Sequence, residues 1–378
     1  MTALLSELRA IIAEEGPLPL SRYMAMALGH PAHGYYMTRD PLGAAGDFTT
    51  SPEISQMFGE LLGLWAGAVW DGMGRPDRIA LVELGPGRGT LMADALRAVR
   101  IVPGLESALS VHLVETSPPL RERQRLMLAE AGPPVTWHET LADVPAGPSI
   151  VLGNEFLDAL PVGQWVWRET GWHERLVGLG PDGSLAYGLA PDPEPGLSGL
   201  PGEPGDIREI GVAAAVAVRS VAERLVTDGG AALLIDYGST DPGPGPTLQA
   251  VRRHRHVDPL AEPGEADITA HVDFGAVARA ASGAGARVHG PVPQGAFLSA
   301  LGIADRAERL AARADAASRA AIDVAIARLA GTQEGAMGEL FKVIGLSAPS
   351  LAGLPALPDS APAGEIGAGG ADLPGPRR

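Results

Sequence analysis

Residues 79–90 read IALVELGPGRGT, and this stretch decides which fold the chain can adopt. Residues 79–84 form a short apolar run that contains one acid, which is typical of a buried strand. Three glycines follow, and residues 91–99 have the pattern of a helix. Glycine allows a tight turn and lets a ligand approach the main chain, while the first N–H groups of a helix are free to bind one. The stretch therefore predicts a strand, a ligand-binding loop and a helix.

The glycine spacing indicates which ligand the loop would bind. Gly85, Gly87 and Gly89 form a G-x-G-x-G pattern, whereas dinucleotide-binding proteins carry G-x-G-x-x-G. Glu83 precedes the first glycine by two residues, and its carboxylate would repel a pyrophosphate but attract an ammonium group. The combination favours S-adenosylmethionine, a nucleoside that carries an amino acid. Taken alone, the motif is also compatible with a tight turn that binds nothing.

Composition excludes several classes of protein. The 378 residues are 46% hydrophobic, which is enough for one large domain with additions or for two domains. No apolar run reaches the roughly eighteen residues of a membrane span, and no secretory or transit leader precedes the first helix, so we expect a cytoplasmic protein that does not enter a membrane. The absence of cysteine excludes disulfides and thiolate sites. A net charge of −16 argues against general nucleic-acid binding, and it suits either a basic protein substrate or solubility.

Strands that alternate with helices predict a parallel sheet whose ligand lies at the carboxyl ends of the strands. The pattern indicates seven strands, at residues 79–84, 111–115, 135–138, 149–153, 231–238, 287–289 and 340–345. Acids or amides follow the first four of them, namely Glu83, Glu115, Glu139 and Asn154–Glu155. Because the ends of neighbouring strands meet at one edge of the sheet, we expect these side chains to gather around the ligand.

Three further regions flank this core. Residues 1–78 form a helical region in which Ser51 is predicted to cap a helix that begins at Pro52 and runs to about Trp70. The loop before it is interpreted either as a lid, with Asp47 and Glu53 facing the ligand, or as a turn. Residues 161–205 predict a β-rich insertion that either forms a substrate or partner surface or covers a sheet edge. Residues 346–378 are rich in Pro, Gly and Ala and are predicted to be disordered.

The sequence predicts no metal site. His271 and Asp273 lie two residues apart, but two ligands are too few and no third group is evident. We expect Asp273 to cap the helix that follows it instead. A helix of the Ala- and Arg-rich residues 305–329 is the last long helix predicted before the final strand.

Seven segments of the chain together resemble the MidA family of S-adenosylmethionine-dependent methyltransferases. They are residues 46–60 (GDFTTSPEISQMFGE), 83–92 (ELGPGRGTLM), 115–121 (ETSPPLR), 154–164 (NEFLDALPVGQ), 267–274 (DITAHVDF), 294–303 (QGAFLSALGI) and 337–343 (MGELFKV). The resemblance spans about residues 5 to 345 in the same order. It implies an α/β fold of the class I methyltransferase type, with a Rossmann-like seven-stranded sheet over residues 79–345, an N-terminal helical lid region and the β-rich insertion.

The resemblance also implies roles in binding the cofactor. Gly85, Gly87 and Gly89 would lie under the methionine part of S-adenosylmethionine, and Glu83 would orient its ammonium group. Glu115 would accept the ribose hydroxyls. Thr140 and Leu141, which follow the third strand, would flank the adenine.

The MidA family includes a mitochondrial complex I assembly factor that methylates an arginine, so the resemblance implies a protein arginine as substrate. The expected partner is the large peripheral-arm subunit of NADH:quinone oxidoreductase, modified in the cytoplasm of a bacterium. Asn154, Glu155 and Asp158 would orient the guanidinium, with Asp47, Ser51, Glu53, Tyr35 and Tyr36 as further candidates. Asn154 and Asp158 are also compatible with helix caps.

Two other functions remain open at this point. A nicotinamide-dependent oxidoreductase would also place an acid such as Glu115 after the second strand, although the glycine spacing and Glu83 argue against it. A non-catalytic assembly chaperone would retain the cofactor fold and would bind its partner through the Trp-containing insertion and the long Ala-rich helix. The sequence also leaves open a homodimer.

Overall fold

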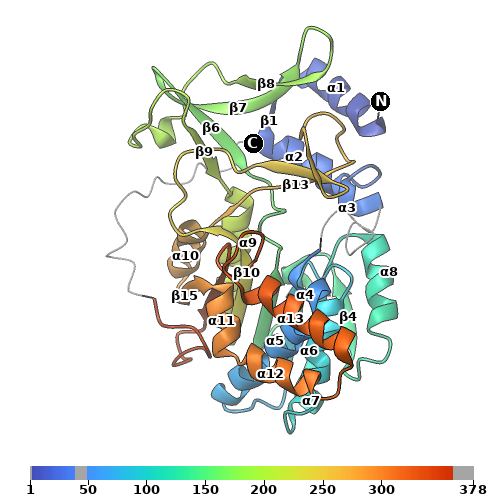
Figure 1. The fold of residues 1–378 in the computed structure, drawn as a ribbon. Coiled ribbons are helices and arrows are strands. Elements are labelled where there is room, and N and C mark those ends of the chain that lie inside the picture. Colours follow the sequence, from blue (N-terminus) through green and yellow to red (C-terminus); the bar gives the residue numbers. More distant parts are fainter. Residues whose placement is uncertain (1, 39–48, 361–378) are drawn as a thin grey trace.

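The computed structural model describes residues 2–38 and 49–360 of the chain (Figure 1). Its centre is a seven-stranded sheet in the order β15-β16-β10-β5-β2-β3-β4, and the short strand β14 (Val272–Asp273) pairs with the end of β10. The strands are β2 (Ile79–Leu84), β3 (Leu109–Val114), β4 (Val135–His138), β5 (Ser149–Asn154), β10 (Gly230–Ser239), β15 (Arg287–Pro293) and β16 (Phe341–Ser347). The predicted seven-stranded α/β sheet is confirmed.

The topology of this sheet determines where a ligand can bind. Strand β16 is antiparallel to both of its neighbours, whereas β10, β5, β2, β3 and β4 are mutually parallel. The chain passes outward from β2 to β4 and then returns to β5 on the other side of β2. The carboxyl ends of β2 and β5 therefore lie side by side where the strand order reverses, and this reversal opens a crevice for a ligand.

Helices bury both faces of the sheet, and all six residues of β2 are buried as a result. One face is covered by α5 (Gln56–Gly72) and α6 (Thr90–Val99), the other by α9 (Val212–Asp228) and α10 (Phe274–Gly283). Helices α5 and α6 approach closely at Gly63, because glycine has no side chain there. A Cβ at this position would lie only 2.3 Å from the Ala95 carbonyl oxygen. Helix α5 thus belongs to the cover of the sheet, although the sequence grouped it with the N-terminal region 1–78.

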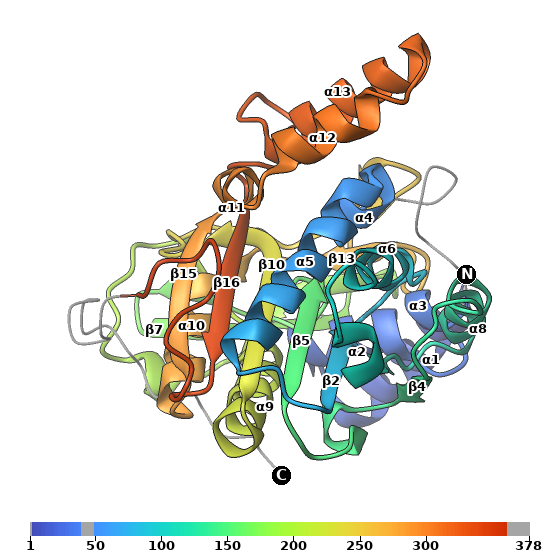
Figure 2. The same cartoon turned by 90° about the horizontal axis from the view of Figure 1, so that it is seen from below.

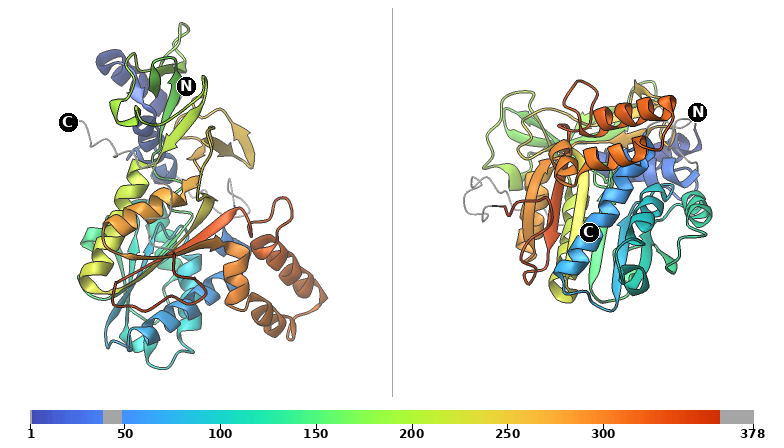
Figure 3. Two further views of the ribbon diagram at one scale, coloured as in Figure 1. Left: turned by 90° about the vertical axis from the view of Figure 1, so that its left-hand side faces the viewer. Right: turned by 60° about the horizontal axis from the view of Figure 1, so that its bottom comes forward.

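The N-terminal helices and the insertion together form a second layer above the carboxyl ends of the central strands (Figures 1 and 3). A five-stranded sheet joins β1 (Leu18–Pro19) to β6 (Gly163–Arg168), β7 (Gly171–Leu179), β8 (Leu185–Leu189) and β9 (Ile207–Ile210). It shares an apolar core with α1 (Ala3–Glu15), α2 (Leu20–Gly29) and α3 (Tyr35–Thr38). The insertion is β-rich as predicted, but it forms its own sheet rather than covering an edge of the central one.

Smaller elements complete the chain. A three-stranded sheet consists of β11 (Gln249–Arg252), β12 (Arg255–Val257) and β13 (Asp267–Thr269). The short helices are α4 (Ser51–Ile54), α7 (Leu105–Ala108), α8 (Pro118–Met127), α11 (Gln294–Ala300), η1 (Leu141–Asp143) and η2 (Pro195–Leu197). Asp273 caps α10 by accepting a hydrogen bond from the Ala276 N–H at 2.8 Å, which confirms its predicted role.

The predicted long helix over residues 305–329 is instead a helical hairpin that projects from the body of the protein (Figure 2). It consists of α12 (Ile303–Ala311) and α13 (Ala316–Ala330). Asp315 interrupts the run because its carboxylate accepts the Ser318 N–H at 2.7 Å and so caps a new helix.

The prediction that the chain is disordered from residue 346 is wrong for residues 346–360. Leu351, Leu354 and Leu357 are buried. The Asp359 carboxylate accepts a hydrogen bond from Arg287 at 3.0 Å and lies 2.8 Å from Nδ1 of His289. The leucines lie three residues apart and supply enough apolar surface to hold this segment against β16. Residues 361–378 lie outside the described residues.

No helix within the described ranges is both long and apolar enough to cross a lipid bilayer. Across the same ranges, no three His, Asp or Glu side chains are grouped so that they could hold a metal ion. His271 instead packs edge-on against the ring of Tyr237, with 5.2 Å between the ring centroids.

Candidate functional site

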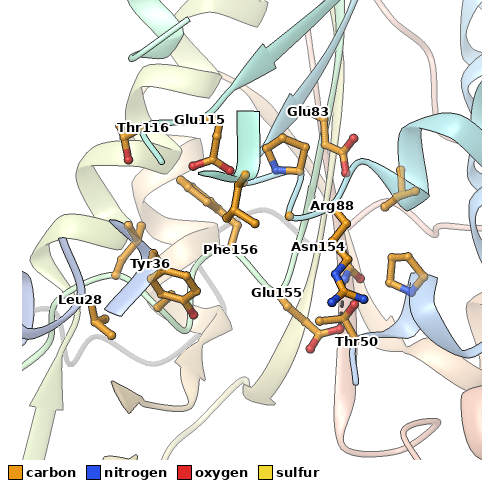
Figure 4. A pocket seen from close by; sticks show the side chains of 18 of the residues that line it. Leu28, Tyr36, Thr50, Glu83, Arg88, Glu115, Thr116, Asn154, Glu155 and Phe156 are labelled. Carbon is orange, nitrogen blue, oxygen red and sulfur yellow. Dashed lines mark hydrogen bonds between the residues drawn. The ribbon is translucent and has the colours of Figure 1, made fainter. Parts of the chain in front are cut away.

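A cavity of about 360 Å³ lies at the carboxyl ends of β2, β3 and β5, between the central sheet and the N-terminal layer (Figure 4). This volume is within the range of small-molecule sites. Among the residues proposed from the sequence, its wall includes Tyr36, Glu53, Glu83, Gly85, Gly87, Glu115, Asn154 and Glu155. Figure 4 shows the carboxylates of Glu83 and Glu115 in one part of the view and that of Glu155, beside Thr50, in another.

The loop between β2 and α6 requires glycine at three positions. Gly85, Gly87 and Gly89 have φ angles of +61°, +54° and +85°, in the left-handed region that other residues rarely adopt. A Cβ on Gly85 would lie 3.1 Å from the ring of Phe156, which lines the cavity. Gly85 and Gly87 line the cavity, whereas Gly89 lies against Gln124 behind the loop. The backbone can therefore come into contact with a ligand over the first two glycines.

Glu83 presents a buried and unpaired carboxylate at the end of β2. Its side chain is 3% exposed, and its Oε2 atom has no hydrogen-bond partner among the described residues. Burial, and secondly the charge of Glu115, raises the pKa of Glu83 to about 8. An unpaired buried charge is costly, but a cationic partner would offset that cost. The site thus fits a ligand whose ammonium group lies next to Glu83.

Glu115 follows β3 and is held in a fixed orientation. Its Oε1 accepts the Ser117 N–H at 2.8 Å, and its Oε2 accepts the side-chain amide of Gln124 at 3.2 Å. Burial raises the pKa of Glu115, although these two hydrogen bonds act in the opposite direction. A carboxylate at this strand end is well placed to accept hydrogen bonds from the vicinal hydroxyls of a ribose.

Gln124 is a site residue that the sequence analysis did not identify. Its side-chain nitrogen also donates to the Gly87 carbonyl oxygen at 2.7 Å, and its side-chain oxygen accepts from the Trp137 indole at 2.9 Å. Gln124 therefore links the glycine loop to Glu115. Gln124 is fully buried on α8, one turn after Leu120, but this burial is a property of the folded structure that the sequence pattern does not reveal.

Asn154 is the last residue of β5, Glu155 follows it, and both residues line the cavity. Glu155 has a φ of +50°, which is rare for a residue other than glycine. Its Oε1 accepts the Ser51 N–H at 3.0 Å and the Asn154 side-chain amide at 3.1 Å. Burial raises the pKa of Glu155 to about 7. The Oδ1 atom of Asn154 has no partner within the described part of the chain, so both residues offer acceptors to a cationic group.

Residues 50–54 close one side of the cavity through Glu53. Thr90 donates to the Glu53 carboxylate at 2.5 Å, and the Arg88 guanidinium lies 3.7 Å from it. Glu53 thus ties this segment to the glycine loop. The prediction that Ser51 caps the helix is wrong, because Ser51 is the first residue of α4, its hydroxyl contacts the Met337 sulfur, and Ser55 interrupts the helix before α5. Asp47 lies outside the described residues.

Other predicted residues are not brought to the cavity wall. Thr140 bonds to the Asp143 carboxylate at the start of η1, and Leu141 packs against the apolar core on the α9 side of the sheet. Asp158 is buried and bonded to the Tyr237 hydroxyl. Tyr35 is fully buried, whereas Tyr36 lines the cavity and donates to Asp267 at 2.7 Å. Glu139 is also absent from the wall.

Comparisons with known proteins agree with this geometry. Residues 61–292 match a family described as S-adenosyl-L-methionine-dependent methyltransferases. Protein arginine methyltransferase NDUFAF7, mitochondrial, from Danio rerio is 38% identical over 365 residues, covering 90% of this chain and 86% of that protein. Its Homo sapiens counterpart is 38% identical over 328 residues, covering 80% and 74%.

A solved structure provides the corresponding comparison in three dimensions. A crystal structure from Burkholderia thailandensis, bound to S-adenosyl-homocysteine, shares 33% sequence identity with this chain and superposes with a TM-score of 0.81. The alignment covers 94% of each chain. A second crystal structure from the same organism, 34% identical, superposes with a TM-score of 0.80.

Proposed function

We propose that this chain, which belongs to the MidA-like family of S-adenosyl-L-methionine-dependent methyltransferases, transfers a methyl group to an arginine side chain of a protein. The observation that carries the proposal is the Glu155 carboxylate. It lines the same cavity as Glu83 and Glu115, and among the described residues its Oε1 atom accepts the Ser51 N–H and the Asn154 side-chain amide. The names of the relatives, which are protein arginine methyltransferases, support this choice of substrate.

The wall formed by β2 and β3 would hold the cofactor. Glu83 would pair with its ammonium group, because the Oε2 atom of Glu83 is buried without a partner among the described residues. Glu115 would accept the ribose hydroxyls, and the backbone at Gly85 and Gly87 would lie against the methionine part. When bound, S-adenosylmethionine supplies a methyl group on a sulfonium, which a nucleophile can attack in line.

Glu155 would orient and activate the substrate. A guanidinium is always protonated and delocalised, so it is a poor nucleophile. A carboxylate that accepts its N–H groups fixes its position and draws positive charge toward the nitrogens that it contacts, which leaves the remaining nitrogen better able to attack. That nitrogen gains the methyl group, the sulfonium becomes a neutral thioether, and the guanidinium gives up one proton in all. Glu155, whose pKa is about 7, would accept that proton from an N–H group that it contacts.

The resemblance to the MidA family supports a narrower proposal about the partner. The substrate would be the large peripheral-arm subunit of NADH:quinone oxidoreductase, and its methylation would support assembly of that complex. The relatives' names place them in mitochondria, whereas the bacterial cytoplasm remains our prediction for this chain.

The test combines binding with transfer. Purified protein would be titrated with S-adenosylmethionine by calorimetry, with NAD as the control ligand, and then incubated with methyl-labelled cofactor and the recombinant subunit. We expect saturable binding of S-adenosylmethionine alone, and label on an arginine located by mass spectrometry. Binding of NAD instead would contradict the cofactor assignment. Cofactor binding without transfer would favour the assembly chaperone, and label on a lysine would overturn the choice of arginine.

A further inference from the structure

Asp236 lies directly beneath the loop that carries Glu155. Strand β10 runs parallel to β5, and Ile235 is paired with Asn154 at the last register position of the two strands. Asp236 is the next residue and is fully buried. It does not line the cavity, so any effect that it has on a substrate must act through other residues.

The carboxylate of Asp236 accepts hydrogen bonds from backbone N–H groups of the loop after β5 and of β10 itself. Its Oδ2 accepts the N–H of Leu157 at 2.9 Å and that of Asp158 at 3.2 Å, and its Oδ1 accepts the N–H of Tyr237 at 3.0 Å. All three partners are donors, which favours the ionised form of a carboxyl group. The acid therefore binds the loop after β5 to the end of β10.

These hydrogen bonds hold a strained backbone conformation in place. Glu155 adopts a φ of +50°, which an L-residue keeps only when its surroundings enforce it. The Glu155 N–H bonds to the Ile235 carbonyl oxygen at 2.8 Å, and the Asp236 carboxylate fixes the backbone two and three residues later. The turn at Glu155 is thus attached to β10 on both sides.

Several charges face this loop. Asp158 and Asp236 lie near the Glu155 carboxylate, Arg328 opposes them, and the Tyr237 hydroxyl bonds to Asp158. Lys342 is paired with Asp236 across β10 and β16, but its ammonium group donates to the Glu339 carbonyl oxygen. Burial and the neighbouring acids raise the pKa of Asp236. Among the described residues, the charges near Glu155 are therefore mainly negative.

We propose that Asp236 is a positioning residue for methyl transfer, which fixes the left-handed turn at Glu155 and so directs the Glu155 carboxylate into the cavity. This inference rests on the role proposed above for Glu155. It assigns no contact between Asp236 and the substrate or the cofactor. An amide at this position cannot accept all three hydrogen bonds, because its nitrogen is a donor only.

The first experiment compares D236N with wild-type protein. We expect kcat for methyl transfer to the recombinant subunit to fall about 10- to 100-fold, as for other small displacements of a reacting group, while calorimetry shows unchanged affinity for S-adenosylmethionine. D273N is the matched control, since Asp273 also accepts a backbone N–H at 2.8 Å beside the end of β10 but does not hold the Glu155 loop. D273N should keep wild-type kcat. Wild-type kcat in D236N would overturn the proposal.

A second readout does not depend on turnover. The titration of Glu155 can be followed by carboxyl carbon NMR, with E155Q used to assign its signal. The D236N change should shift the midpoint of that titration, because a Glu155 carboxylate released from its fixed turn has different neighbours. An unchanged midpoint would contradict the proposal, since a residue that only stabilises the fold elsewhere would leave Glu155 as it is.

A double-mutant cycle separates this proposal from the one on which it rests. If Asp236 acts through Glu155, the D236N change should cost little further activity in an E155Q background. If the fold-loss of kcat in the double variant equalled the product of the losses in the two single variants, Asp236 would not act through Glu155. Full activity of E155Q would refute the role of Glu155 itself, whereas an inactive E155Q with a fully active D236N would refute only the role of Asp236. Should D236N not fold, D236E moves the carboxylate by one methylene, and wild-type kcat in that variant would contradict the proposal.

Discussion

The side chain of Gln124 donates a hydrogen bond to the Gly87 carbonyl oxygen at 2.7 Å, and the same nitrogen lies 3.2 Å from the Glu115 carboxylate. One buried amide on α8 therefore links the glycine loop after β2 to the acid after β3, which are two parts of the proposed cofactor site. Nothing in the order of the sequence places these residues together. Their contact exists because α8 packs beside the loop between β2 and α6.

Replacing Gln124 with leucine should weaken cofactor binding about tenfold while leaving the fold intact. Leucine fills a similar volume but leaves the Oε2 atom of Glu115 and the indole N–H of Trp137 without the hydrogen bonds that Gln124 makes to them. A lost hydrogen bond to a buried group costs about 1–3 kcal/mol. Calorimetric titration with S-adenosylmethionine would measure the change. Gln333→Leu serves as the control, because the Gln333 side chain is exposed and donates to the Ala327 carbonyl oxygen, away from the cavity. Equal affinities for the two variants would contradict the role of Gln124.

Replacing Gly87 with valine should abolish cofactor binding. The φ of +54° at Gly87 is unfavourable for a β-branched residue by about 1–2 kcal/mol, and the new side chain would stand where the ligand meets the backbone. Gly74→Val imposes a similar strain at a φ of +82°, in open space away from the cavity. Both variants should lose comparable stability in thermal unfolding, and only Gly87→Val should lose binding. Retained binding in Gly87→Val would exclude the glycine loop as the cofactor site.

Glu83 should make the ligand-free protein less stable as the pH rises. Its pKa of about 8 in the folded protein exceeds the ordinary value of 4.5, so the folded state retains a proton that the unfolded state releases. The contribution of Glu83 to stability is therefore complete below about 4.5 and is lost as the pH rises to about 8, by up to roughly 1.4 kcal/mol per pH unit.

Glu83→Gln should remove this dependence. Denaturant unfolding of the ligand-free proteins should show that the free energy of unfolding of the variant rises relative to that of wild type between pH 5 and pH 8. Above that range the difference should not increase further. The exposed Glu122 provides the control, because its replacement by Gln should leave the pH dependence unchanged. The Glu83→Gln variant should also bind S-adenosylmethionine weakly. If the difference in the free energy of unfolding between Glu83→Gln and wild type did not change with pH, Glu83 would not be a buried carboxyl group with a raised pKa.

The sequence predicted those parts of the site that depend on strand ends. Glu83, Glu115 and Asn154–Glu155 each follow an apolar run, and parallel strands bring their ends together whatever the details of packing. Asp236 also ends an apolar run, and the same reasoning could have identified it. Gln124 depends on the orientation of a helix, which local pattern does not determine.

Some expectations based on the amino-acid composition of a segment were wrong, because a tertiary contact or a helix cap determines the structure there. The Ala-rich run over residues 305–329 favours helix throughout, but the Asp315 carboxylate ends it by capping α13. Thr140 pairs with Asp143 in a capping interaction and does not line the cavity, so its place beside the adenine stays a prediction. The tail is rich in Pro and Gly, but it holds three spaced leucines whose partner surface on β16 is visible only in the folded structure.

Leu354→Ala should lower the free energy of unfolding by about 2–4 kcal/mol, which is typical of a truncated leucine in a well-packed core. A Cβ on Gly345 would lie 2.6 Å from the side chains of both Leu354 and Leu357, so the segment packs directly on the backbone of β16. Leu340→Ala is the control, since Leu340 is 47% exposed. Equal, small effects of both changes in urea unfolding would mean that residues 351–357 do not pack on the sheet in solution.

The rate of methyl transfer should rise as the pH increases through about 7, because only the ionised form of Glu155 can orient a guanidinium and accept its proton. Burial raises the pKa of this carboxyl group to about 7, and the hydrogen bonds from Ser51 and Asn154 favour its ionised form. A plot of wild-type kcat against pH should therefore fall on the acidic side, in a single step whose midpoint is about 7. Glu155→Gln should reduce kcat at least 100-fold, as for loss of a general base, and should remove this step. Cofactor affinity should be unchanged, since Glu155 is not among the residues proposed to bind the cofactor. A step that persists in Glu155→Gln would assign the titrating group to another residue.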